Sequence, residues 1–184
     1  MRIYALCDYE TLVKKNISLL EYIKILNKYN ITLLQYRDKI SSIEQIKQNL
    51  IFLKQHLNIP IIINDNLNLV EFCDGLHVGQ EDLYKINIDQ QLAVKLLRKK
   101  IGNKILGLST HNEIEILKAN ELDLDYIGLG AYRDTSTKDV STVLGEKISY
   151  LAKISKHKVA AIGGIKLDDN IENIYYYVIG SGLL

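Results

Sequence analysis

Residues 75–82 read GLHVGQED, and this stretch decides the fold. Leu76–Val78 is short and apolar, like a strand buried in a core, yet the chain turns at Gly79 and continues with acidic residues, Glu81 and Asp82. A core strand that ends in acids makes sense where its carboxyl end reaches an exposed rim. The rest of the chain shows whether other strands end in the same way.

The same pattern, a brief apolar run with polar residues after it, recurs along the chain. The runs are β-branched and largely continuous, which is typical of strands buried on both faces of a parallel sheet. We predict eight strands, at Ile3–Leu6, Leu33–Tyr36, Ile61–Ile63, Leu76–Val78, Ile105–Leu108, Tyr126–Leu129, Val159–Ile162 and Tyr177–Ile179.

Amphipathic segments separate these runs and predict helices. They lie at residues 17–30, 42–57, 88–100, 112–122 and 146–155, with a short third helix at Leu67–Phe72 and another short helix starting at Asp168–Asn170. Strands that alternate with helices predict an α/β fold, and eight of them predict a compact (β/α)8 TIM barrel forming one domain, residues 1–184. A doubly wound open sheet is the structural alternative.

No helix follows the predicted eighth strand. Either the barrel does without it, a partner covers the gap, or the chain is truncated. Apolar surface on the first and eighth strands and on their flanking helices is then expected to be covered by a second subunit, so a homo-oligomer is one expectation.

Composition limits the function classes. The 184 residues carry a formal net charge of +1, which argues against a broad nucleic-acid or membrane footprint. No apolar run approaches the roughly 20 residues of a membrane span, and the N-terminus lacks a signal-peptide pattern. The two cysteines, Cys7 and Cys73, lie in apolar contexts typical of buried, reduced thiols. A cytoplasmic protein is expected.

The strand ends carry the candidate chemistry. Gln35, Arg37 and Lys39 alternate on one side of the second strand, where two cations suit a phosphate or pyrophosphate; a surface salt bridge is the alternative. Asp65 and Asp82 follow neighbouring strands, and two such carboxylates could hold Mg²⁺. A helix N-cap is the ordinary role for residues 64–66.

Further polar groups follow the later strands. Ser109 and His111 come after the fifth strand, at a helix start of the kind that also binds phosphates. A long polar loop after the sixth strand is the candidate for a flap over the site. The remaining anion-binding candidates are Thr135, Thr137 and Lys138 in that loop, Gly163 and Gly164 after the seventh strand, and Gly180 and Ser181 after the eighth.

These motifs together resemble thiamine phosphate synthase, a family that shares its superfamily with the thiazole tautomerases. The resemblance runs from Tyr4 to the C-terminus, and HVGQED together with TSTK is its specific part. The matching stretches are QYRDK, IINDN, DGLHVGQEDL, GLSTHN, DYIGLGAYRDTSTK and AIGGI.

The resemblance implies a Mg²⁺-dependent transferase of thiamine biosynthesis. Such an enzyme joins an aminopyrimidine methyl pyrophosphate to a thiazole phosphate and releases pyrophosphate by a dissociative mechanism. It implies metal ligands at Asp65 and Asp82 and catalytic roles for Lys138, Ser109 and Arg37. It further implies that Gln35, Arg37, Lys39 and Asn64 contact the pyrimidine pyrophosphate substrate, and that Ser109 and Lys138 also contact its pyrophosphate group. The thiazole phosphate contacts that it implies come from Thr135, Thr137, Gly164, Gly180 and Ser181.

Some positions depart from the family pattern. Ala131 stands where the family usually has proline, and Arg133 is an additional cation, either near the site or facing solvent. Two alternative functions stay open: a thiazole tautomerase on the same barrel, with His111 as candidate acid or base, and a non-catalytic phosphate-binding barrel.

Overall fold

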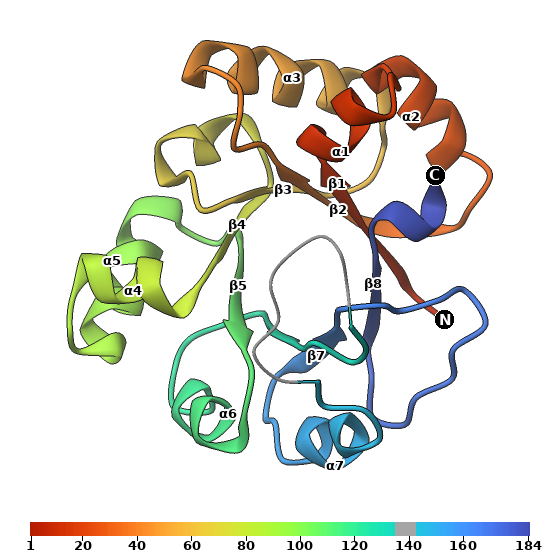
Figure 1. The fold of residues 1–184 in the computed structure, drawn as a ribbon. Coiled ribbons are helices and arrows are strands. Elements are labelled where there is room, and N and C mark those ends of the chain that lie inside the picture. The colour runs from red at the N-terminus through yellow and green to blue at the C-terminus, as the bar shows by residue number, and fades with distance from the viewer. Residues whose placement is uncertain (135–142) are drawn as a thin grey trace.

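A closed barrel of eight parallel strands forms the centre of the molecule. The computed structural model describes residues 1–134 and 143–184. Each strand pairs with the next in sequence and β8 pairs with β1, so the barrel prediction is confirmed and an open sheet is excluded (Figure 1). The strands are β1 (Ile3–Asp8), β2 (Ile31–Arg37), β3 (Ile61–Asn64), β4 (Gly75–Val78), β5 (Ile105–Thr110), β6 (Tyr126–Leu129), β7 (Lys158–Ala161) and β8 (Tyr176–Ile179).

Helices surround the barrel (Figure 1). The predicted ones are α2 (Leu19–Leu26), α3 (Ile43–His56), the 3-10 helix η1 (Leu67–Phe72), α5 (Gln90–Ile101), α6 (Glu113–Ala119) and α7 (Lys147–Lys153). Two short helices were not predicted: α1 (Tyr9–Lys14), which begins at the side-chain cap of Asp8, and α4 (Gln80–Ile86). The helix expected from Asp168 is wrong, because Asp169 instead accepts from the backbone N–H of Lys166 in a turn.

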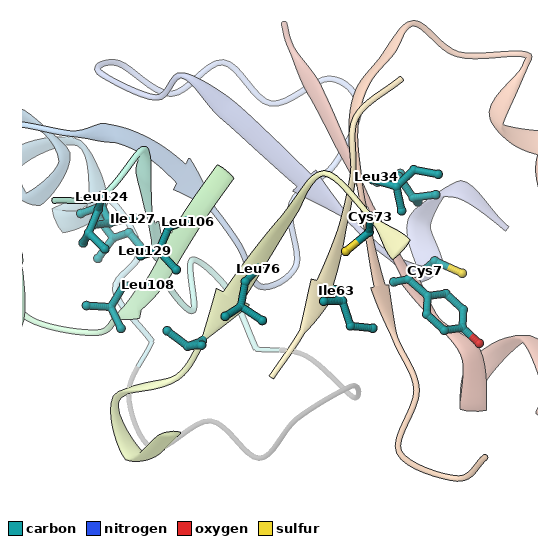
Figure 2. Packing of buried hydrophobic residues seen from close by; sticks show 14 of the residues in the cluster. Cys7, Leu34, Ile63, Cys73, Leu76, Leu106, Leu108, Leu124, Ile127 and Leu129 are labelled. Carbon is teal, nitrogen blue, oxygen red and sulfur yellow. The ribbon is translucent and has the colours of Figure 1, made fainter. Parts of the chain in front are cut away.

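The main core lies between the outer face of the barrel and these helices. Figure 2 shows Leu34, Ile63, Leu76 and Leu108, all buried, on this layer. Such burial supplies the largest favourable term in folding. Cys7 and Cys73 belong to the same layer and are free, buried thiols, as predicted.

A second, smaller cluster fills the inside of the barrel. The rings of Tyr4, Tyr126 and Tyr176 meet there edge to face, with centroids 5.8 to 6.2 Å apart. Gly107 makes room for Tyr126, because a Cβ at this position would lie 2.1 Å from the Tyr126 Cζ atom. Gly128 does the same for His77, at 3.2 Å from the Cε1 atom.

The expected exposed apolar surface on the first and eighth strands is not found. The outward residues Ala5, Cys7, Tyr177 and Ile179 are all buried. After β8 the chain forms the 3-10 helix η2 (Ser181–Leu183), whose Leu183 packs into the main core. The strands themselves are therefore covered within the chain, whereas Val13 of α1 and Leu20 of α2, on the flanking helices, are exposed.

In the part of the chain that the structure describes, none of the helices combines the length and apolar character that crossing a membrane requires.

Replacing Gly107 by alanine should destabilise the protein by about 3 kcal/mol, because the new methyl group overlaps the Tyr126 ring. Gly128→Ala should cost less, since its contact is longer. Urea unfolding of both variants measures the difference. Equal and small losses would show that Tyr126 repacks freely.

At Tyr22 a substitution is expected to stabilise the protein. The buried hydroxyl of Tyr22 finds no hydrogen-bond partner among the described residues. Tyr22→Phe should therefore raise the free energy of unfolding by about 1 kcal/mol. The control Tyr36→Phe should lower it by a similar amount, because that hydroxyl donates to Asp38 and accepts from Asn49.

Candidate active site

Polar side chains gather at the carboxyl ends of the strands, which meet at one rim because all strands run in parallel. Asp8 ends β1, Arg37 ends β2, Asn64 ends β3 and Ser109 lies near the end of β5. Asp82 lies in the first turn of α4, just past β4.

Asp65 and Asp82 form a carboxylate pair on this rim. Burial, and next the negative charge of Asp82, raise the pKa of Asp65. Burial is the largest single influence on Asp82 and disfavours its charge, but the hydrogen bond and positive charge of Lys85, 2.8 Å from Oδ1, together with hydrogen bonds from Asp65 and the Gly79 backbone, outweigh it and lower the Asp82 pKa. The predicted juxtaposition of the two acids is therefore what the structure has.

The backbone holds this pair in place. Asp65 has a φ of 61°, a left-handed conformation that aspartate tolerates better than most residues, and its N–H donates to the His77 carbonyl at 2.8 Å. Asp82 sits at the start of α4, where a carboxylate interacts favourably with the helix dipole. The acids that end GLHVGQED are thus the first turn of a helix.

Arg37, at the end of β2, and Lys39, just past it, face acids at the ends of the two neighbouring strands. Arg37 donates to Asp8, and Lys39 Nζ lies 4.0 Å from Asp65 Oδ2. Sequence reasoning missed Asp8, although an acid directly after the first strand was the signal. Asp8 also caps α1 by accepting from the backbone N–H and the hydroxyl of Thr11, at 3.2 and 2.6 Å.

A chain of hydrogen bonds runs through the barrel interior between two points of the rim. On one side, Asn64 donates to Asp65 at 2.6 Å and accepts from Gln35 at 2.5 Å. Gln35 accepts in turn from the hydroxyl of Tyr4.

On the other side, His77 contacts both the hydroxyl of Tyr126, at 2.7 Å from Nδ1, and that of Ser109, at 2.9 Å from Nε2. A contact of 3.0 Å between the hydroxyls of Tyr4 and Tyr126 joins the two halves. Sequence reasoning placed Gln35, Asn64 and Ser109 at the site but missed the buried residues that connect them.

Other polar residues of the strand ends serve the fold. Gln80 donates to the Ser109 carbonyl at 2.8 Å, which ties α4 to β5. His111 Nδ1 lies 3.0 Å from Glu115 Oε2 within the start of α6, and Asn112 is the N-cap of that helix.

The loops after β6 and β7 are joined by Arg133. Its guanidinium donates twice to Asp169, at 2.6 and 2.7 Å, and once to the Gly164 carbonyl at 2.8 Å. Gly163 and Gly164 have φ values of 91° and 62°, and a Cβ on either would collide with the β6 loop. Of the two expectations for Arg133, the structure favours a place near the site over simple exposure to solvent, because the guanidinium is paired with Asp169 and contacts Gly164, one of the predicted site residues.

Three of the predicted site residues, Thr135, Thr137 and Lys138, lie outside the described residues, as does half of the predicted flap, residues 135–142. Gly180 follows β8, and Ser181 begins η2 beside β1.

Comparison with known proteins decides the family. The family model described as thiamine monophosphate synthase matches residues 3–178. The chain belongs to this family.

Curated relatives agree. The chain is 38% identical over 141 residues to a protein of Persephonella marina named thiamine-phosphate synthase, and 36% identical over 182 residues to one of Lawsonia intracellularis with the same name. The matches cover 73% and 94% of this chain, and 63% and 77% of those relatives. The predicted family is thus confirmed.

Solved structures show the same fold. A thiamine phosphate pyrophosphorylase from Pyrococcus furiosus superposes with a TM-score of 0.76 at 21% identity, covering 98% of this chain and 85% of that one. An orotidine 5'-monophosphate decarboxylase from Methanocaldococcus jannaschii superposes with a TM-score of 0.61 at 16% identity, covering 98% and 89%.

The family resemblance implies Mg²⁺, and the residues present fit it. Among residues 1–134 and 143–184 there is no cluster of three or more acidic, histidine or cysteine side chains that could hold a metal. The Asp65–Asp82 pair nevertheless suits Mg²⁺, which is typically held by one or two carboxylates together with waters and phosphate oxygens. The like charges that raise the Asp65 pKa would be relieved by a cation between them.

The ion pair between Arg133 and Asp169 should make the free energy of unfolding depend on pH. The hydrogen bond from Arg133 lowers the pKa of Asp169 below its ordinary value. The stabilisation is therefore present above about pH 4 and is lost as the pH falls through the lowered pKa. Asp169→Asn should be less stable than the natural chain at pH 7, and the gap should narrow in acid. Urea midpoints for both proteins between pH 7 and pH 3 measure this, and a constant gap would contradict the ion pair.

Proposed function

We propose that this chain joins an aminopyrimidine methyl pyrophosphate to a thiazole phosphate, giving thiamine phosphate and pyrophosphate. The observation that carries the proposal is the carboxylate pair, Asp65 and Asp82, flanked on the same rim by Arg37 and Lys39. An acidic pair beside two cations suits a pyrophosphate bound together with a divalent cation. The names of the curated relatives support the same reaction.

Departure of pyrophosphate calls for positive charge around the leaving group. Arg37 supplies a planar fork and Lys39 a point charge. Arg37 is already oriented by Asp8, so little side-chain entropy is lost when an anion binds. Asp65 and Asp82 would hold Mg²⁺, which neutralises negative charge on the pyrophosphate when bound.

The substrate ring would lie over the barrel interior, against Gln35 and Asn64. Both amides are held by hydrogen bonds on their far sides, so their positions are fixed before the substrate arrives. Fixed placement of two reactants converts a bimolecular step into an effectively unimolecular one. The contacts proposed for Thr135, Thr137, Lys138, Gly164, Gly180 and Ser181 complete the site, with Lys138 also on the pyrophosphate.

The tautomerase is less well supported. Its candidate acid or base, His111, is engaged by Glu115 at the start of α6, and its backbone N–H donates to the same carboxylate at 2.9 Å. A tautomerase also has no need for an acidic pair beside two cations. A cytoplasmic location and a homo-oligomer remain parts of the proposal; the free, buried cysteines support the former.

Asp82→Asn tests the metal role. The change removes one of the two carboxylates proposed to bind Mg²⁺. Turnover should then fall by about 100-fold or more, the usual effect of losing one electrostatic contact in an active site. Glu81→Gln is the matched control, because it removes an adjacent exposed acid from the same helical turn. Thiamine phosphate formation from both precursors is followed against Mg²⁺ concentration, and folding is checked by thermal unfolding.

The outcomes separate the candidate functions. Near-natural activity of Asp82→Asn contradicts the metal role. Thiazole isomerisation by the natural chain without any thiamine phosphate favours the tautomerase. Ligand binding without either reaction favours a non-catalytic phosphate-binding barrel.

A further inference from the structure

Part of the barrel interior of this protein is polar, although such barrels are usually filled by apolar side chains. Tyr4 and Tyr126 are 1% exposed, Gln35 is 4% and His77 is 8% exposed. Buried polar groups need partners, and the chain of hydrogen bonds described above provides them. The proposed reaction gives Tyr4, Tyr126 and His77 no role, so their purpose is an open question.

The direction of the hydrogen bonds follows from the acceptor at one end. A carboxylate oxygen accepts, so Asn64 must turn its Nδ2 group toward Asp65, at 2.6 Å. Its Oδ1 atom then faces Gln35 and accepts from Nε2 at 2.5 Å. Gln35 is left with Oε1 toward Tyr4, whose hydroxyl must donate to it.

Each tyrosine has one proton to give, which extends the direction across the barrel. The hydroxyl proton of Tyr4 is already donated to Gln35. At the 3.0 Å contact between the two hydroxyls, Tyr126 therefore donates and Tyr4 accepts. The oxygen of Tyr126 can then only accept from His77, 2.7 Å away. His77 therefore carries its proton on Nδ1.

The direction ends at Ser109. A neutral ring protonated on Nδ1 has a bare lone pair on Nε2. Ser109 Oγ lies 2.9 Å from this Nε2 atom and must donate its proton to it. Toward the rim, the Ser109 hydroxyl can then only accept hydrogen bonds.

We propose that this one-directional chain makes Ser109 a hydrogen-bond acceptor toward the substrate, with Tyr4, Tyr126 and His77 as positioning residues. Ser109 then recognises an N–H donor, such as the amino group of an aminopyrimidine. A phosphate oxygen, which only accepts, gains nothing from it. The identity of the substrate rests on the proposed function, and the inference moves Ser109 away from the pyrophosphate contact that the family resemblance implies.

The tautomer of His77 tests the direction without any ligand. Nitrogen-15 NMR of the full chain, with His77 assigned sequentially, distinguishes a protonated from a bare ring nitrogen. We expect a protonated Nδ1 and a bare Nε2. A neutral ring protonated on Nε2, or a doubly protonated ring, overturns the proposal.

Tyr4→Phe tests whether the direction is transmitted. Without the Tyr4 hydroxyl, Tyr126 can donate its proton to His77 instead. The proton of His77 should therefore move from Nδ1 to Nε2, although Tyr4 does not itself contact His77. Tyr126→Phe, which removes the adjacent link, should also lower the population protonated on Nδ1. Tyr36→Phe is the matched control, a buried tyrosine hydroxyl on the outer side of the barrel that should leave His77 unchanged. An unchanged tautomer in both test variants overturns the proposal.

Ligand preference tests the consequence. Calorimetry compares the aminopyrimidine methyl pyrophosphate with its analogue carrying an oxo group in place of the amino group. The natural chain should prefer the amino compound by about tenfold, the worth of one hydrogen bond, and Ser109→Ala should lose most of that preference. Equal binding of both compounds by the natural chain overturns the acceptor role. If the natural chain binds neither compound, the proposed function is contradicted. The tautomer of His77 then decides by itself whether the hydrogen bonds run in the proposed direction.

Discussion

Closure of the barrel is the constraint on which the rest of the structure depends. β8 pairs with β1 in parallel, with Ile3 beside Tyr177 and Ala5 beside Ile179. Once the sheet closes, all carboxyl ends point to one rim, and residues as distant in sequence as Asp8 and Ser109 border one site. Closure also creates a largely buried interior, so polar groups placed there need partners.

Most of the fold could be predicted because its signals are local. A strand buried on both faces is an uninterrupted apolar run, and each of the predicted runs became a strand with bounds shifted by a few residues at most. The N-caps Ser42 and Asn112 are residue types that favour this position, although side-chain chemistry alone does not separate Ser42 from Ser41 or Asn112 from Thr110. The short helices α1 and α4 were not predicted, because each has only a turn or two and shows little apolar periodicity.

The candidate site was predictable in part, for a similar reason. Asp65, Asp82, Arg37 and Lys39 stand directly after strands, so their placement on the rim follows from topology. The partners of a side chain do not follow in this way. The pairing of Arg133 with Asp169 spans 36 residues, and that of Tyr4 with Tyr126 spans 122. Such contacts depend on the radius and register of the closed barrel, which no short stretch of sequence encodes.

The contact between Arg37 and Asp8 shapes which anions this rim can select. A ligand does not meet an unpaired guanidinium there; it meets one that already has a charged partner. In the proposed site, Arg37 would keep Asp8 as the partner of one terminal nitrogen and offer its remaining N–H groups to a ligand. Because Asp8 offsets part of the guanidinium charge, a singly charged carboxylate would gain little there, whereas a pyrophosphate would present several acceptors and more charge. Asp8 would thus favour densely charged anions over common monoanions at this rim.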